Sequence, residues 1–394
     1  MLIGLALFYA GLVRQKNVLN TMMMSFVSIT IVSLTWALVG YSLAYSENNI
    51  WIGGTEHFLM NGIGLEGENI PKILDFLFQS TFAIITAALI SGAIVERMEF
   101  KAYMIFIAIW SIVVYAPLTK WVWGGGLFHH LPTGTAIDFA GGTVVHINAA
   151  VAALVLALMI GKRKDFGKIA MLPNNVPFVL LGAGILWFGW FGFNGGSSLA
   201  GDAKAALAMA NSLLCPAAAA IVWIILDLVF VKKVTAVGLA TSIIVGLVII
   251  TPAAGLISPL SAIAMGLIGT APCYFAIMWR ARTGLDDSLD VFSAHGLGGI
   301  IGSILTGFFV SKIWGAEVDG STQQVLTQTL AVIIAIVYSA ASTFIIASII
   351  KIFMPLRVTD NEERLGLDIS MHGEEAFSEG DGAILISLKE GEKK

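Results

Sequence analysis

Two histidines stand in stretches of the chain that are otherwise almost entirely apolar. His146 lies in GGTVVHINAA and His295 in DVFSAHGLGG. A neutral imidazole offers one hydrogen-bond donor and one acceptor, and removal from water disfavours its charged form. Two such rings facing each other could accept a proton from a small passing solute and return it. Each could instead be a buried histidine bonded to a backbone carbonyl, but their corresponding positions in two halves of the chain favour the pair.

Aromatic side chains gather near the ends of several apolar segments. The clusters are Phe78 and Phe82 in FQSTF, Trp121 and Trp123 in KWVWGGG, and Trp187, Trp190 and Phe193 in WFGWFGFNGGS. An aromatic belt at the membrane interface would explain each of them singly. Trp123, which is followed by three glycines, fits such a belt less well. A ring above an aqueous cup would attract a small cation by cation–π interaction, worth roughly 0.5 to 2 kcal/mol.

A carboxylate precedes each histidine by less than three helical turns. Asp138 in AIDFAGG comes before His146, and Asp290 in SLDVF comes before His295, each at the end of an apolar segment. An acidic residue in this position is commonly a helix cap. We expect a structural role for both, and for Asp138 also electrostatic support for recruiting a cation.

Residue combinations typical of an enzyme are not found. The glycine-rich stretches GGG, FNGGS and GLGGIIGS follow no predicted strand and carry no P-loop lysine. His129 and His130 have no cysteine or carboxylate partner at the spacing of a metal site. Cys215 and Cys273 lie within or beside apolar runs, so we expect no disulfide framework. A membrane enzyme is therefore disfavoured, and we expect no catalytic residue, no metal and no cofactor.

The composition indicates which elements must position these residues. Of the 394 residues, 57% are hydrophobic and 12% charged, against roughly 25% charged residues in a soluble domain. A helix of about 20 residues spans a hydrocarbon core of about 30 Å. The sequence therefore predicts an all-α polytopic membrane protein with about eleven transmembrane helices. The net charge of -4 is spread over loops and a tail, which implies no nucleic-acid partner.

Ten apolar runs are long enough to be spans. They lie near residues 20–45, 73–95, 101–119, 140–161, 176–195, 204–231, 234–251, 260–279, 290–310 and 323–353. The stretch Met1–Leu12 is about half as long as a span requires. It lacks the basic n-region and the cleavage site of a signal peptide, so we interpret it as the end of a first helix that is short or truncated.

Basic residues in the connecting loops predict the orientation of the chain. Twelve lysines and arginines fall in the loops of one side, and four fall in the alternate loops, which also carry the acidic stretch 47–68. Because basic loops stay in the cytoplasm, we expect the N-terminus outside and the C-terminus cytoplasmic. Segments one to five and six to ten would form two inverted five-helix repeats, followed by a long eleventh helix. We expect a transporter domain at 1–353 and a cytoplasmic tail at 354–394.

The segments DFAGGTVVHINAA and GWFGFNGGS resemble the signature of the ammonium transporters of the Amt/Mep/Rh type, Amt branch. The likeness runs from GLALFYAGLVRQKNVLN to GLDISMHGEEAF, nearly the whole chain. It implies a homotrimer in the cell (plasma) membrane, with one pore per subunit. Each pore would recruit ammonium, deprotonate it and pass ammonia and the proton, so that transport is electrogenic.

The resemblance also implies roles for individual residues. The external ammonium site would be Trp123, Ser197 and Phe82, with Phe78 close by, and the stacked gate would be Phe82 and Phe193. The pore would be lined by Trp190 and by His146 and His295, which would share a hydrogen bond. Potassium requires oxygens that replace its water shell, and none is expected in this pore.

The tail carries a second resemblance. The stretch from Gly366 and Asp368 to His372 and Gly373 is similar to the region of this family on which PII-type signal proteins dock. A solvated acidic tail is the alternative. No role is assigned to residues 378–394.

Two other functions stay open at this point. A neutral gas channel of the Rh type is one, although Trp123 argues against it. An ammonium sensor or receptor is the other, and a fused kinase or cyclase domain, which this chain does not contain, would favour it. The sequence leaves undecided the net charge that is moved, the affinity for ammonium, and whether methylammonium is accepted.

Overall fold

The computed structural model describes residues 1–67 and 69–377. Glu68 of the predicted acidic loop and the stretch 378–394 lie outside the described residues. In the described part the chain is helical, apart from loops and two isolated backbone bridges, Met98–Arg357 and Leu131–Gly134.

The α-helices of the described part follow one another along the whole chain. In order they are α1 (Leu2–Leu12), α2 (Val18–Thr35), α3 (Tyr41–Tyr45), α4 (Lys72–Ile90), α5 (Phe100–Trp110), α6 (Ala116–Val122), α7 (Asn148–Ile160), α8 (Val176–Gly196), α9 (Ala203–Leu226), α10 (Ala236–Ile250), α11 (Pro259–Arg280), α12 (Leu297–Phe309), α13 (Thr322–Phe353) and α14 (Asp360–Leu365).

Nine helical stretches of the described residues are long and apolar enough to cross a membrane, and α1 and α10 are shorter apolar helices. The prediction of an all-helical protein with many spans is therefore confirmed. Some spans join several helices: the predicted run 20–45 lies within Gln15–Tyr45, and the run 101–119 lies within Phe100–His129. A π-helical turn continues the helix in both.

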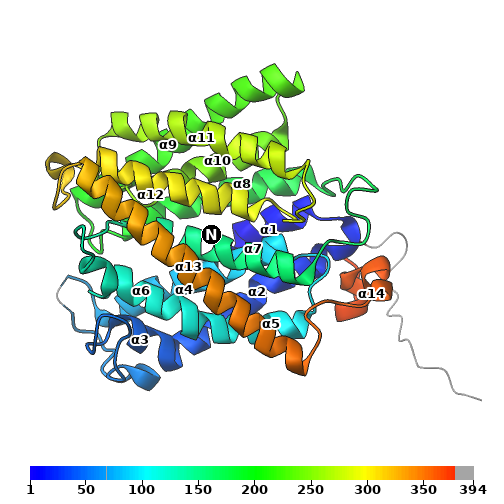
Figure 1. Ribbon diagram of the computed structural model, residues 1–394, viewed down its shortest axis with the longest axis horizontal. Coiled ribbons are helices and arrows are strands. Elements are labelled where there is room, and N and C mark those ends of the chain that lie inside the picture. The colour runs from blue at the N-terminus through cyan, green and yellow to red at the C-terminus, as the bar shows by residue number, and fades with distance from the viewer. Residues whose placement is uncertain (68, 378–394) are drawn as a thin grey trace, which may run out of the picture.

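Figure 1 shows α13 crossing the bundle obliquely, with α8 to α12 on one side of it and α3, α4 and α6 on the other. α1 and α7 lie near the centre of the view. Of the most apolar 18 residues in Gly142–Ile160, which includes α7, 78% are buried, whereas the corresponding share in Gln15–Tyr45 is 28%. The residues of α7 therefore lie inside the protein, while one face of α2 is left for lipid.

Glycines allow α1 and α8 to cross closely at the junction of the two halves. A Cβ atom added to Gly182 would lie 2.4 Å from the backbone nitrogen of Phe8, and one added to Gly11 would lie 2.6 Å from the carbonyl oxygen of Asn175. Small residues at a helix crossing are the means of close packing in lipid, where no hydrophobic force drives helices together.

Side-chain caps fix where several long helices begin. An oxygen of the N-cap residue accepts a hydrogen bond from a backbone N–H of the first turn, which would otherwise lack a partner. The capping residues are Asn175 of α8, Asp202 of α9, Ser258 of α11 and Ser321 of α13.

Candidate functional site

The two histidines meet at the centre of the protein. His146 lies in a π-helical turn, Gly142–Ile147, that leads into α7, and His295 lies in a second one, Phe292–Gly296, that leads into α12. Their Nδ1 atoms are 3.2 Å apart, and the two rings are nearly parallel, with centroids 5.3 Å apart. When both rings are neutral, this bond requires that one carry its proton on Nδ1 and the other on Nε2.

A small cavity adjoins the pair. Its volume is about 10 Å³, close to the least space that holds one water molecule. Besides the histidines it is lined by apolar and aromatic residues: Met1, Leu5, Phe8, Ile85, Leu89, Leu186, Trp190, Phe193 and Ile244. His146 Nε2 is buried and has no hydrogen-bond partner among the described residues. The cavity thus has an apolar wall beside a histidine nitrogen that is free to accept a proton in the described structure.

Two stacked phenylalanines separate this cavity from a larger one. The rings of Phe82 and Phe193 lie 4.1 Å apart between centroids, with 22° between their planes. Phe193 lines the histidine cavity, and Phe82 lines the larger one. Phe78 packs edge-on against Phe82, and Trp190 stacks on His146 with centroids 5.4 Å apart.

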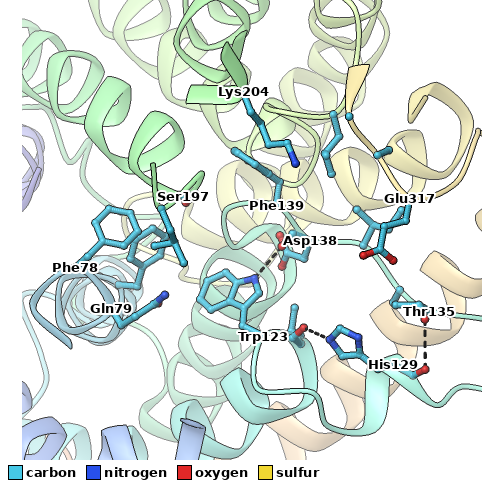
Figure 2. Close-up of a pocket in the computed structure, with 18 of the residues that line it drawn as sticks. Phe78, Gln79, Trp123, His129, Thr135, Asp138, Phe139, Ser197, Lys204 and Glu317 are labelled. Carbon is cyan, nitrogen blue, oxygen red and sulfur yellow. Dashed lines mark hydrogen bonds between the residues drawn. The ribbon is translucent and has the colours of Figure 1, made fainter. Parts of the chain in front are cut away.

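We call the larger cavity the Trp123 vestibule; it has a volume of about 610 Å³ and is lined by Trp123, Phe78, Phe82, Ser197 and Asp138 among others. Figure 2 shows Trp123 and Ser197 on its walls. The indole Nε1 of Trp123 donates to the carbonyl oxygen of Asp138 at 2.8 Å, which fixes the ring. Ser197 donates its hydroxyl proton to the carbonyl of Phe193 at 2.9 Å, so its oxygen can still accept a hydrogen bond.

The glycines after Trp123 let the chain turn away beneath the ring. A Cβ atom on Gly124 would lie 2.1 Å from the carbonyl oxygen of Ala44, and Gly125 has φ of 71°. The contact excludes a larger side chain at Gly124, and the positive φ disfavours one at Gly125. This explains why KWVWGGG places a tryptophan in the wall of a cavity.

Asp138 positions the turn that carries His146. Its carboxylate accepts four backbone N–H groups, from Gly141, Gly142, Thr143 and Val144, at 2.7 to 3.2 Å. The side chain is 8% exposed. Asp138 is therefore a helix cap, and its hydrogen-bonding capacity is directed at the backbone.

The capping expectation for Asp290 is wrong. The residue that caps the turn with His295 is Asp287, which accepts the N–H groups of Val291 at 3.0 Å and Phe292 at 2.8 Å. Asp290 instead forms an ion pair with Arg280. The one sequence signal that distinguishes the two aspartates is their spacing: Asp138 and Asp287 each precede their histidine by eight residues, whereas Asp290 precedes His295 by five.

A second vestibule lies on the other side of the histidines. It has a volume of about 380 Å³, and its lining runs from His295 to Asp227, with Trp223, Tyr274 and Asp290. We call it the Asp227 vestibule. His295 lines both this vestibule and the small cavity, so the histidine pair stands between two wide openings.

A group of buried charges surrounds the loops near the Asp227 vestibule. Glu96 pairs with Arg163 at 2.8 Å and with Arg14 at 3.0 Å, and Arg163 pairs with Asp286 at 2.8 Å. Burial raises the pKa of Glu96, but Arg163 and Arg14 outweigh it and lower the pKa to about 2. We call these residues the Glu96 network. Sequence reasoning counted its arginines only as loop charges and missed their pairing.

The described part of the tail is docked on the protein. Asp368 accepts the N–H groups of Leu19 at 3.0 Å and Asn20 at 2.8 Å, which belong to the first turn of α2. Leu367 N–H donates to the side chain of Asn17, and His372 Nε2 lies 3.1 Å from the amide of Asn20. The stretch from Leu367 to His372 is thus docked rather than solvated, whereas Glu374 and Glu375 are exposed.

The backbone of the tail depends on two glycines at its turns. Gly366 has φ of 110° and lies against Lys16, where a Cβ atom would be 2.6 Å from the lysine's carbonyl oxygen, and Gly373 has φ of 71°. Lys16 Nζ donates to the carbonyl oxygens of Glu363 and Arg364 at 2.8 and 2.7 Å. Both glycines therefore serve the docked conformation.

Comparison with known proteins identifies relatives over nearly the whole chain. The model of the Ammonium Transporter Family matches residues 1–377. An ammonium transporter of Aquifex aeolicus is 47% identical over 95% of this chain and 89% of its own length, and one of Bacillus subtilis is 45% identical over 95% and 94%.

Solved structures agree with these relatives. A protein titled Sensor Amt Protein superposes with a TM-score of 0.87 at 31% identity, covering 94% of each chain. The crystal structure of Saccharomyces cerevisiae Mep2 superposes with a TM-score of 0.83 at 33% identity, covering 91% of this chain and 84% of that one.

Proposed function

The chain belongs to the ammonium transporter family and is a multi-pass membrane protein, and on this premise we propose that it takes up ammonium, removes one proton and passes ammonia and the proton across the cell membrane. The observation that carries the proposal is the cavity of about 10 Å³ beside two hydrogen-bonded histidines. It has room for one small molecule and offers it almost no oxygen atoms.

The Trp123 vestibule is the proposed capture site, and the bias of basic loops toward the opposite side supports an outward-facing position for it. Ammonium there can face the ring of Trp123 and donate a hydrogen bond to Ser197 Oγ. Phe82 and Phe193 then form a gate that excludes water from the cavity beyond. Trp123 is the main source of selectivity for a cation over a neutral gas.

The apolar cavity supports deprotonation. An ion stripped of water without compensating ligands carries a large penalty. Ammonium avoids it by giving its proton to an acceptor and continuing as neutral ammonia, whereas potassium has no proton to give. His146 Nε2 and the Nδ1–Nδ1 bond supply sites that can accept and relay that proton. Ammonia would regain a proton in the Asp227 vestibule, so each cycle would move one positive charge.

Assembly and regulation extend the proposal. We propose a homotrimer with one pore per subunit, a transporter domain at 1–353 and a regulatory tail at 354–394 that receives a PII-type signal protein. The docked tail supports a regulatory role, because Asp368 caps α2 and α2 packs against α4, which carries Phe78 and Phe82. Release of the tail would thus remove a constraint on a helix next to the gate.

The test is the current that an ammonium pulse produces across a solid-supported membrane carrying the purified protein. We expect a current with ammonium, none with potassium, and a weaker response to low ammonium in Trp123→Ala. Internal alkalinisation without current would replace the proposal with a neutral gas channel. No response of either kind would favour a sensor.

A further inference from the structure

One positively charged side chain lines the Trp123 vestibule. Among the residues described on its walls, Lys204 is the single lysine or arginine, and it shares the cavity with Trp123 and Ser197. Figure 2 shows the amine of Lys204 pointing into the vestibule beside Phe139. A fixed positive charge repels a free cation, so its presence at a site for ammonium requires an explanation.

Helix stability does not explain Lys204. It lies in the first turn of α9, whose N-cap Asp202 accepts from Ala205 N–H at 2.8 Å. A cation near a helix N-terminus is unfavourable, because the helix dipole is positive there. Asp202 is also engaged by Ser198, whose hydroxyl donates to it at 2.6 Å. The lysine therefore gives α9 no capping interaction.

The charge of Lys204 is not neutralised by a direct partner in the part of the chain that the structure describes. Its Nζ atom makes no hydrogen bond there, and no carboxylate oxygen lies within the 4.0 Å of an ion pair. Two lining carboxylates are engaged elsewhere, because Asp138 accepts four backbone N–H groups and Asp75 accepts the hydroxyl of Tyr41 at 2.7 Å. Asp202 interacts with the charge of Lys204 only at a distance, without an ion pair, so the positive charge also acts on the cavity.

A loop between α12 and α13 supports the lysine and supplies an opposing charge. A Cβ atom on Gly315 would lie 3.2 Å from Cε and 3.8 Å from Nζ of Lys204, so the lysine stem runs along this glycine. Glu317, two residues further along the loop, lines the same vestibule and forms no ion pair in the described structure. The Trp123 vestibule is thus lined by one lysine and one glutamate that form no ion pair in the described structure.

We propose that Lys204 and Glu317 set the affinity of the Trp123 vestibule for ammonium, the lysine lowering it and the glutamate raising it. The inference rests on the proposed function, in which this vestibule captures the cation. At a separation of about 10 Å in water, one unit charge changes the local concentration of a monovalent cation about twofold, and the change is larger where protein replaces water. Salt screens the effect over about 8 Å at physiological ionic strength.

The test compares the ammonium concentration that gives half-maximal current for the full chain and its variants on a solid-supported membrane. For Lys204→Gln we expect this concentration to fall about two- to fivefold, with an unchanged maximal current and a smaller difference at high ionic strength. Glu317→Gln should raise it up to about twofold. Lys204→Arg, which keeps the charge, should behave as the native chain.

Lys312→Gln is the matched control. Lys312 is exposed, lies in the same loop as Gly315, and does not line the vestibule, so its removal should leave the half-maximal concentration unchanged. An unchanged value for Lys204→Gln in a protein that carries ammonium current would overturn this inference alone. Absence of ammonium current in the native chain would overturn the proposed function, and the inference with it.

Discussion

His146 and His295 are held by the same local construction in two different surroundings. An aspartate eight residues before each histidine caps a π-helical turn, and the turn continues into α7 in one half and into α12 in the other. On one side the construction faces the Trp123 vestibule, which is aromatic. On the other it faces the Asp227 vestibule and the Glu96 network, where charges are paired.

The difference between the Trp123 vestibule and the Asp227 vestibule indicates that the two have different functions. The element that holds the histidines is repeated, and in the proposed mechanism both halves use this geometry to transfer the proton. The two vestibules are not repeated, and in the same mechanism one captures the cation and the other releases it.

The largest loss of stability is expected when the capping aspartates Asp138 and Asp287 are replaced. Asp138→Ala leaves four buried N–H groups without an acceptor, and Asp287→Ala leaves two. Because an unsatisfied buried group costs about 1 to 3 kcal/mol, Asp138→Ala should lower the free energy of unfolding by roughly 4 kcal/mol or more, and Asp287→Ala by about half as much. Thermal unfolding in detergent measures both, and equal losses would contradict the comparison.

The Glu96 network should stabilise the folded protein by an amount that depends on pH. Glu96→Gln removes the carboxylate that Arg14 and Arg163 share, so that Arg163 keeps only Asp286 and Arg14 only Asp165. This should cost about 3 kcal/mol at neutral pH. Since the pKa is lowered to about 2 from 4.5, the contribution is complete above about pH 4.5 and is lost as the pH falls toward 2.

The measurement is unfolding of native chain and variant across this range. The gap between them should narrow only below about pH 4.5. A gap that is constant down to pH 2 would show that the ion pairs do not stabilise the fold.

The Trp123 vestibule should determine the affinity for ammonium, and the Asp227 vestibule should not. Trp123→Ala removes the ring from the capture site and should raise the half-maximal ammonium concentration about 2- to 30-fold, the equivalent of roughly 0.5 to 2 kcal/mol. Trp223→Ala, in the Asp227 vestibule, should leave it near the native value. If Trp223→Ala raised the half-maximal concentration more than Trp123→Ala does, the Asp227 vestibule would be the capture site, which would contradict the proposal.

The smallest loss of stability is expected when the contact between the tail and α2 is removed. Asp368→Ala removes the cap of α2 and should cost about 1 kcal/mol. Hydrogen exchange should become faster at Leu19 and Asn20, while the amides of the turn with His146 stay as protected as before. Unchanged exchange at Leu19 would mean that the docked contact does not persist in solution.

Most spans and the histidine pair were predictable from the sequence, because lipid requires long apolar helices and leaves each polar residue within them conspicuous. Trp123 and Phe193 were found through aromatic density and family resemblance. Asp287 was missed in favour of Asp290, since both lie near the end of a span and only the repeated spacing distinguishes them. The repeat was too weak in sequence for that spacing to be noticed.

The Glu96 network and the docked tail could not be read from the sequence. Glu96 meets Asp286 through Arg163 across 190 residues of chain, and Asp368 meets Leu19 across 349. Such pairs form only when helix packing brings distant loops together, and a loop charge looks the same whether it is solvated or paired. Lys204 likewise gains its place in the vestibule from the packing of α9 against neighbouring loops.

The central claim is that the histidine pair removes the proton of ammonium, and the most direct test is the current of His146→Ala beside the native chain, with ammonium and with potassium. The account predicts an ammonium current in the native chain, none with potassium, and at least about a hundredfold loss of the ammonium current in His146→Ala, the contribution of a positioned proton acceptor. A folded His146→Ala protein with the native ammonium current would contradict the claim.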